Sequence, residues 1–327
     1  MFKVYDQWPS MAEAAYLENY SPIEFSGINQ IIFAGMGGSG TLGDFFAAIL
    51  SKSSIHVSVV KGYEIPKNID SKTLLVVTSV SGNTIETLTV LKSTIKKKCK
   101  IITFSSGGKM EEISKENNLI HFKIPKTHSP RASFPTFLYT MLKIFEPILP
   151  IKENDIKESI SEIYKIKDKI SSSNLTETNP SIKLAKWIKS IPLIYYPWGL
   201  ESAAIRFKNS LQENCKIHVI VENVIESGHN GIISWEKKSN VEPILLLGQD
   251  DHYKTKERWQ ILKKYFKENE IDFEEIISLN GNIITKLINL IYLLDYATIY
   301  LAVFSNIDPT PIKSIDYIKK LMIKKDH

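Results

Sequence analysis

The sequence has few cysteines and lacks any spacing typical of a metal site or a disulfide framework. Among its 327 residues, only Cys99 and Cys215 are cysteines. They form neither a CxxC pair nor a Cys/His spacing of the kind that binds zinc. We therefore expect no disulfide scaffold and no bound metal, and we expect a cytoplasmic protein with reduced thiols.

The sequence also lacks an apolar targeting segment and a long uninterrupted hydrophobic run. The first residues, MFKVYDQWPSMAEA, contain no apolar signal region. The longest apolar run, residues 283–304, is interrupted by Lys286, Asn289 and Asp295. This pattern predicts a buried helix and not a membrane span.

A strong charge of one sign is missing as well. The formal net charge is only +5, and it is dispersed over many lysines and glutamates. This balance is typical of a solvated surface and argues against nucleic acid or a membrane as a partner. Hydrophobic residues make up 43% of the chain and charged residues 24%, as in ordinary globular proteins. The length allows two domains, each with its own core.

Short apolar segments alternate with helical patterns along both halves of the chain. In the first half, strands are predicted at residues 31–34, 55–60, 74–77, 100–104 and 120–124. In the second half, strands are predicted at residues 192–196, 217–221, 243–247 and 275–279, without glycine- or serine-rich loops. A charged and then polar stretch at 150–180 marks the candidate boundary. We predict two tandem α/β domains, 1–150 and 151–327, each with a doubly wound parallel sheet.

The loop GMGGSG, residues 35–40, follows the first predicted strand and precedes a helix. It is not a P-loop, because no Gly-Lys-Ser/Thr follows it. Gly35, Gly37 and Gly40 fit the GxGxxG pattern of dinucleotide sites. However, the next strand is followed by Lys61, and the acidic residue expected there is missing. A nucleotide is therefore not the favoured ligand.

A second loop, SVSGNT at residues 79–84, also follows a predicted strand and opens a helix. Hydroxyl groups at Ser79, Ser81 and Thr84, together with the helix N-terminus, predict a site for one anion. Neutral donors suit a single terminal phosphate, whereas a nucleoside triphosphate would require a lysine and a carboxylate for its metal. The alternative is that these residues only cap the helix.

The two loops GMGGSG and SVSGNTIET resemble those of the sugar isomerase (SIS) domain family. Three further segments, GLESAAIRFKNSLQENCK, ESGHNGIISW and IDPTPIKSIDYIKK, make the whole chain similar to the bifunctional phosphoglucose/phosphomannose isomerases. The resemblance implies two tandem SIS domains. It also implies that glucose 6-phosphate and mannose 6-phosphate are interconverted with fructose 6-phosphate, without a cofactor, in glycolysis and gluconeogenesis.

The resemblance also assigns roles to single residues. Those implied to hold the phosphate of a hexose 6-phosphate are Gly38, Ser39, Ser79, Ser81 and Thr84. Glu213 corresponds to the base, and Arg131 to the cation near the reacting carbons. His229 corresponds to a ring-opening histidine that the partner subunit of a homodimer supplies. The C-terminal lysine is placed at Lys319, with Lys320 and Lys313 left open.

Two positions depart from the family pattern. Val80 stands where a tyrosine is frequent, and Gly231 stands where an acidic residue is usual. The first should matter little to phosphate binding. The second leaves the surroundings of His229 open.

Aldose–ketose isomerisation requires residues of these types. One base must move a proton between C2 and C1, and a nearby cation must stabilise the enediolate. On a helix, Glu213 shares one face with Arg206 and Asn209; without the resemblance it would be read as an exposed carboxylate. Two alternatives stay open: another SIS-type isomerase or lyase, and a non-catalytic sugar-phosphate-binding regulator. A regulator would not require Glu213, Arg131 and His229 together.

Overall fold

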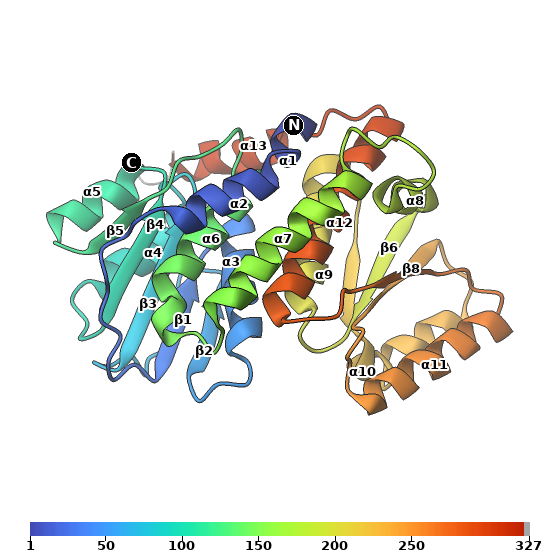
Figure 1. Ribbon diagram of the computed structural model, residues 1–327, viewed down its shortest axis with the longest axis horizontal. Coiled ribbons are helices and arrows are strands. Elements are labelled where there is room, and N and C mark those ends of the chain that lie inside the picture. Colours follow the sequence, from blue (N-terminus) through green and yellow to red (C-terminus); the bar gives the residue numbers. More distant parts are fainter. Residues whose placement is uncertain (324–327) are drawn as a thin grey trace.

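The computed structural model describes residues 1–323 and contains two parallel β-sheets with helices on their faces (Figure 1). The first sheet has the order β2-β1-β3-β4-β5. Its strands are β1 (Gln30–Ala34), β2 (His56–Val60), β3 (Thr73–Ser79), β4 (Lys100–Ser105) and β5 (Ile120–Lys123). The second sheet has the order β7-β6-β8-β9. Its strands are β6 (Ile191–Tyr196), β7 (Ile220–Asn223), β8 (Val241–Leu247) and β9 (Glu274–Ile277). The predicted pair of doubly wound sheets is confirmed.

The central strands of the first sheet are buried on both faces. Every residue of β1 and β3 is buried, as expected for continuous apolar runs in a parallel sheet covered by helices. The covering helices of this domain are α3 (Gly38–Leu50), α4 (Ile85–Thr94), α5 (Gly108–Glu116) and α6 (Phe134–Phe145), followed by the 3-10 turn η1 (Glu146–Ile148).

A long apolar helix, α12 (Ile283–Phe304), forms the core of the second half and reaches the first. It is long and apolar enough to cross a membrane, but 83% of its most apolar window is buried inside the protein. It packs against α7 (Glu153–Ile170), α8 (Pro180–Trp187) and α9 (Glu201–Ser210). The prediction of a buried helix is confirmed.

The N-terminal helices, which the sequence patterns did not predict, also pack on α12. They are α1 (Phe2–Tyr5) and α2 (Trp8–Leu17). The Tyr292 hydroxyl donates to the carbonyl of Tyr5 at 2.6 Å. The indole of Trp8 stacks on Tyr292 with ring centroids 5.2 Å apart. Aromatic packing thus ties the first residues of the chain to its last long helix.

Two predicted elements of the second half end differently in the structure. The strand predicted at 217–221 lies at Ile220–Asn223. The helix on which Glu213 was expected keeps α-helical geometry only to Ser210, and Glu213 lies on the π-helical turn that follows, η2 (Leu211–Cys215). The remaining helices are α10 (Val224–Ser227), the 3-10 turn η3 (Gly231–Glu236), α11 (Tyr253–Glu268) and α13 (Lys313–Ile323).

The topology gives each sheet one point at which the strand order reverses. In the first sheet this point lies between β1 and β3, and in the second between β6 and β8. Ligands of such sheets bind beyond the carboxyl ends of the strands at this point. Helices α3 and α9, which follow β1 and β6, pack against each other. The last helix, α13, returns to the first domain (Figure 1).

Candidate active site

The GMGGSG loop turns tightly at the carboxyl end of β1. Gly37 has a positive φ of 53°, a conformation that favours glycine. A Cβ atom at Gly40 would lie 2.9 Å from the carbonyl oxygen of Gly35. Larger residues would therefore not fit. Helix α3 begins directly after Gly37, and no side chain caps its N-terminus.

The SVSGNT loop forms a second tight turn, at the carboxyl end of the neighbouring strand β3. Gly82 has a φ of 68°, and a Cβ atom there would lie 1.7 Å from the carbonyl oxygen of Gly107. The Ser79 hydroxyl accepts a hydrogen bond from the Gly82 amide at 3.1 Å and lies 2.9 Å from the Thr84 hydroxyl. No side chain caps α4. The hydroxyls therefore shape the loop and leave the helix N-terminus open, contrary to the capping alternative.

The two loops touch. The Ser39 hydroxyl accepts a hydrogen bond from the Val80 amide at 3.4 Å, and β1 and β3 are paired neighbours. The Ser81 hydroxyl accepts from the Asn83 amide at 3.2 Å. The hydroxyl groups predicted to bind phosphate thus lie at one edge of the sheet, beside two uncapped helix N-termini, which attract anions.

Arg131 and Glu213, 82 residues apart in the sequence, form an ion pair between the two domains. The Arg131 side chain is 6% exposed and that of Glu213 is 30% exposed. The guanidinium also donates to the carbonyl of Pro309 at 2.7 Å. Three distant segments therefore meet at this pair: the loop before α6, the π turn after α9, and the segment before α13.

Beneath this pair lies a second, fully buried one. Arg206 of α9 and Asp295 of α12 are 2% and 0% exposed and lie 2.7 Å apart. Arg206 also donates to the carbonyl oxygen of Arg131 at 2.7 Å, and the Ser210 hydroxyl donates to Asp295 at 2.6 Å. Removing two charges from water is costly unless they are paired and hydrogen-bonded. This pair holds the backbone that carries Arg131.

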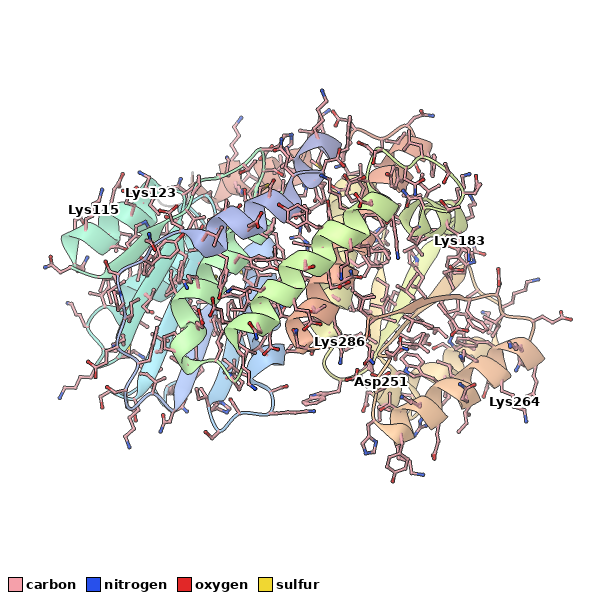
Figure 2. The ribbon with its side chains drawn as sticks, in the orientation of Figure 1. Lys115, Lys123, Lys183, Asp251, Lys264 and Lys286 are labelled. Atoms are coloured by element: carbon pink, nitrogen blue, oxygen red, sulfur yellow. The ribbon has the colours of Figure 1, made fainter. Side chains whose placement is uncertain are left out.

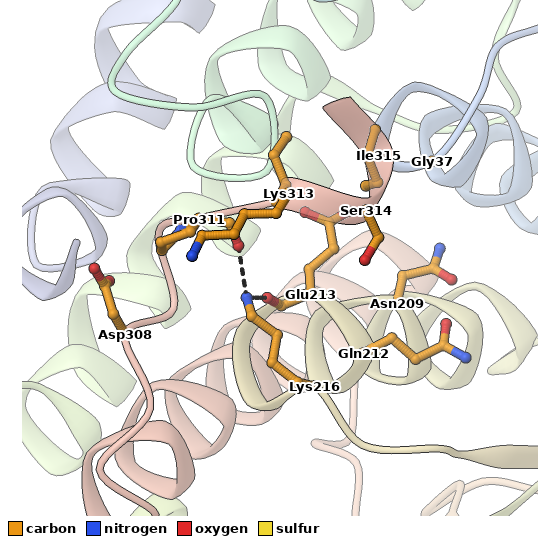
Figure 3. Close-up of a pocket in the computed structure, with 11 residues that line it drawn as sticks. Gly37, Asn209, Gln212, Glu213, Lys216, Asp308, Pro311, Lys313, Ser314 and Ile315 are labelled. Atoms are coloured by element: carbon orange, nitrogen blue, oxygen red, sulfur yellow. Dashed lines mark hydrogen bonds between the residues drawn. The ribbon is translucent and has the colours of Figure 1, made fainter. Parts of the chain in front are cut away.

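Glu213 opens onto a cavity of about 650 Å³ (Figure 3). Gly37 of the glycine loop lies on one side, and Asn209 and Gln212 lie beside Glu213 on the other. The π turn explains why Glu213 faces the cavity, because it redirects the side chains that follow α9. Such turns are frequent at functional sites. The predicted shared face holds for Asn209 and Glu213, whereas Arg206 points into the core.

Two lysines line this cavity, and Lys319 is not among them. The Lys216 ammonium donates to the carbonyls of Glu213 and Pro311, the latter at 2.8 Å (Figure 3). Burial and the positive charge of Arg131 lower the pKa of Lys216. Lys313, at the start of α13, lines the cavity. Lys319 lies further along α13 and is exposed.

His229 lies outside this cavity in the single chain. It is exposed on the turn after α10, where its amide donates to the carbonyl of Glu226 at 2.9 Å. A Cβ atom at Gly231 would lie 2.2 Å from a carboxylate oxygen of Glu222. The carboxylate of Glu222, on strand β7, thus lies against the position where the family usually has an acidic residue.

Sequence patterns did not single out Lys216, Gln212 or the Arg206–Asp295 pair as parts of the site. A signal for the pair existed, since Asp295 interrupts an otherwise apolar helix and a buried charge requires a partner. No such signal marks Lys216. Its φ of 60° ends the π turn, and its contact with the Pro311 carbonyl forms only when the segment before α13 folds back.

Comparison with known proteins agrees with this architecture. Residues 24–143 match the SIS domain, and residues 177–322 match the bacterial phospho-glucose isomerase C-terminal SIS domain. A bifunctional phosphoglucose/phosphomannose isomerase of Caldicellulosiruptor bescii is 30% identical over 100% of both chains. The chain belongs to the bifunctional phosphoglucose/phosphomannose isomerase family.

Other relatives extend this result. The bifunctional phosphoglucose/phosphomannose isomerase of Aquifex aeolicus is 29% identical over 90% of each chain. Among solved structures, the C-terminal domain of glucosamine-fructose-6-phosphate aminotransferase from Francisella tularensis superposes with a TM-score of 0.71. It covers 94% of this chain and 96% of its own at 16% identity, and it supports the fold alone. The predicted tandem SIS architecture is confirmed.

Proposed function

We propose that this chain is a metal-independent aldose–ketose isomerase that interconverts glucose 6-phosphate and mannose 6-phosphate with fructose 6-phosphate. The observation that carries the proposal is the contact of Glu213 with Arg131. Glu213 lines a cavity that Gly37 of the glycine loop also lines. The names of the relatives supply the substrate class. The phosphate would bind at the two uncapped helix N-termini and the hydroxyls of Ser39, Ser79, Ser81 and Thr84.

In the proposed mechanism Glu213 moves a proton between C2 and C1. It takes the proton from C2 of the aldose, which gives the cis-enediolate, and returns it to C1 while the hydroxyl proton passes from O2 to O1, which gives the ketose. Negative charge then builds up on the O1 and O2 oxygens, and Arg131 stabilises that charge. The substrate oxygens would take over part of the contact that Arg131 makes with Glu213, which frees the carboxylate to act as a base.

Ring opening requires an acid and a base at O5 and O1. We propose that His229 of a second copy completes the cavity, since His229 lies outside it in one chain, and that the protein acts as a homodimer. The proton donor would be a lysine. Lys319 was the expected residue, but Lys216 and Lys313 line the cavity, and these two are the stronger candidates.

A coupled assay tests the activity. Fructose 6-phosphate is offered to the full chain, and the formation of glucose 6-phosphate and mannose 6-phosphate is measured with and without chelator. We expect both products and no effect of chelator. Glu213→Gln should lose about 10²–10⁴-fold in kcat while keeping its affinity for a substrate analogue, because the phosphate loops are untouched.

The matched control is Gln212→Glu, which places a carboxylate one residue from the proposed base. In combination with Glu213→Gln it should not restore activity, because it faces a different direction on the turn. Binding of hexose 6-phosphate without turnover would favour the regulator. Loss of activity in chelator, or full activity in Glu213→Gln, would refute the mechanism.

A further inference from the structure

A second cavity lies at the switch point of the second sheet. Its volume is about 850 Å³, and its lining comes from both domains. Trp198 and Gly199 follow β6, and Asp250 follows β8. Lys286 and Asp251 line this cavity, and Figure 2 shows both near the lower centre of the view, between the two domains. The location is where ligands of open α/β sheets bind, yet no residue of the proposed isomerase reaction lies there.

Two helices join this cavity to the candidate active site. Helix α3 begins beside Gly37 in the first cavity, and its C-terminal end, with Lys52 just beyond, lines the second. Helix α9 begins after Leu200 in the second cavity, and Glu213 beyond its end lines the first. The two helices pack against each other. Each cavity is therefore lined in part by one end of α3 and one end of the α9 segment, and the two cavities lie about 20 Å apart along α3.

The second cavity differs from the first in its anion-binding donors. The Asp251 carboxylate accepts from the Gly248 amide at 3.0 Å and from the Trp259 indole at 2.9 Å. The His252 ring accepts from the Lys254 amide and so caps α11. Side chains of the protein thus occupy the backbone donors that follow β8, whereas those that follow β3 in the first domain stay open. Helix α9, which begins beside Leu200, has no side-chain cap.

The charges that line the second cavity also balance. Lys286 forms an ion pair with Asp250, and the other two charged residues are Lys52 and Asp251. A phosphate would meet two carboxylates and no open cluster of hydroxyls. These features favour an uncharged ligand.

The other residues that line the second cavity provide one aromatic ring and a pair of polar groups that a ligand could contact. The Trp198 side chain is 62% exposed, and the Lys52 ammonium lies 5.8 Å from its ring centroid. A Cβ atom at Gly199 would meet nothing within 4 Å, so space is open beside the indole. The Asp250 carboxylate is 56% exposed, whereas Lys286 is 10% exposed. They place an acceptor and a donor side by side, as neighbouring hydroxyls of a sugar require.

We propose that the second cavity binds an uncharged hexose, with the apolar face of its ring on Trp198 and its hydroxyls on Asp250 and Lys286. Because α3 and α9 each span both cavities, the bound hexose shifts the glycine loop and the π turn that carries Glu213. The cavity is then a regulatory site for an unphosphorylated sugar. Binding itself does not depend on the proposed isomerase function, whereas the effect on turnover rests on it.

Calorimetry and saturation-transfer NMR with D-glucose and D-mannose test the binding. The full chain should give a saturable response with a millimolar Kd. Trp198→Phe should keep this response, and Trp198→Ala should weaken it by about tenfold, because only the first retains a ring to stack on. Lys286→Met should weaken it as well. Ser79→Ala, which alters the SVSGNT loop and does not line the second cavity, should leave it unchanged.

Several outcomes would overturn the site. These are no saturation in the wild type, an unchanged response in Trp198→Ala, loss of the response in Ser79→Ala, or preferred binding of inorganic phosphate or adenosine. A Trp198→Ala protein that only changes its oligomeric state would point to a second copy of the chain as the occupant, and would also overturn it.

The coupling has its own test. Saturating D-glucose should change the KM for fructose 6-phosphate by about fivefold or more in the wild type, and it should not do so in Trp198→Ala. The variant separates coupling from competition at the first cavity, because competition would persist in it. An unchanged KM in the wild type with intact glucose binding would refute the coupling and leave the binding site standing. Failure of the isomerase proposal would show as no turnover at all.

Discussion

The two domains share a topology but differ in the backbone donors that follow two equivalent strands, β3 and β8. In the first domain, α4 begins without a side-chain cap, and serine and threonine hydroxyls lie beside its N-terminus. In the second, His252 caps α11 and Asp251 accepts from the Gly248 amide. Helices α3 and α9, which follow β1 and β6, are both uncapped. The sheet therefore provides a place for a ligand, and the loops decide whether that place holds an anion.

Neither domain holds the complete candidate active site. The first contributes the phosphate loops and Arg131, and the second contributes Glu213 on the π turn. The buried contact of Arg206 with Asp295, and its bond to the Arg131 carbonyl, fixes the two halves relative to each other. The placement of Arg131 against Glu213 thus depends on the Arg206–Asp295 ion pair, which does not itself line the cavity.

Breaking that ion pair should have the largest effect. Arg206→Met leaves Asp295 buried without its partner and should lower the free energy of unfolding by about 3–5 kcal/mol. Urea denaturation measures it. The control is Lys254→Met, which breaks an exposed pair with Glu257 and should cost less than about 1 kcal/mol. Equal costs for the two variants would contradict the structural role.

The glycines of the two domains offer the next comparison. Gly82→Ala should destabilise the fold by about 3 kcal/mol, because strain at positive φ adds to a collision with the Gly107 carbonyl. Gly199→Ala has a positive φ but open space, and should cost only about 1 kcal/mol. Thermal and urea unfolding of both variants measure the difference. A milder effect at Gly82 would show that the loop can relax.

Ser79 in the first domain and His252 in the second should differ in what they contribute, substrate binding in one case and stability in the other. Ser79→Ala should raise the KM for fructose 6-phosphate about tenfold, because it removes a hydroxyl of the phosphate loop. His252→Ala should leave that KM unchanged and lower the free energy of unfolding by about 1 kcal/mol, because it removes a helix cap. Steady-state kinetics with urea titrations separate the two. An unchanged KM in Ser79→Ala would remove that hydroxyl from the phosphate site.

The smallest expected effect is a pH dependence from Asp251. Burial, more than any other cause, raises the pKa of this carboxyl above its usual range. The folded state then holds a proton that the unfolded state has already lost. The contribution of Asp251 to stability should therefore fall as the pH rises from about 4, the ordinary pKa of an aspartate. The difference in unfolding free energy between the wild type and Asp251→Asn, measured against pH, should show this slope.

The sequence predicted much of the fold, because both sheets rest on patterns that are local. Apolar runs such as 74–77 and glycine loops are visible in a few residues, and short strands that alternate with helices specify a doubly wound sheet. The tandem repeat and the helix at 283–304 followed in the same way. The N-terminal helices were missed, because α1 packs on α12, nearly 300 residues away, and α2 packs on α6 and α7.

The candidate site was predictable only in part. The loops 35–40 and 79–84 carry their own signals, and the family resemblance placed Glu213 and Arg131. The positions of Lys216 and Lys313 in the cavity depend on the segment before α13 folding back over the π turn. No local pattern encodes such a contact. The role of Lys319 stays a prediction.

The π turn after α9 also has a consequence for chain length. A π turn contains one residue more than an α-helical path through the same space needs. Deleting Gln212 would let the turn close as an α-helix, with Asn214 and Cys215 still buried in their places. Glu213 would then move toward the position of Gln212, by up to one residue step of about 100° around the helix axis, and its carboxylate would leave Arg131. A single-residue deletion in this turn should thus leave the chain folded while it removes the proposed base from its place beside Arg131.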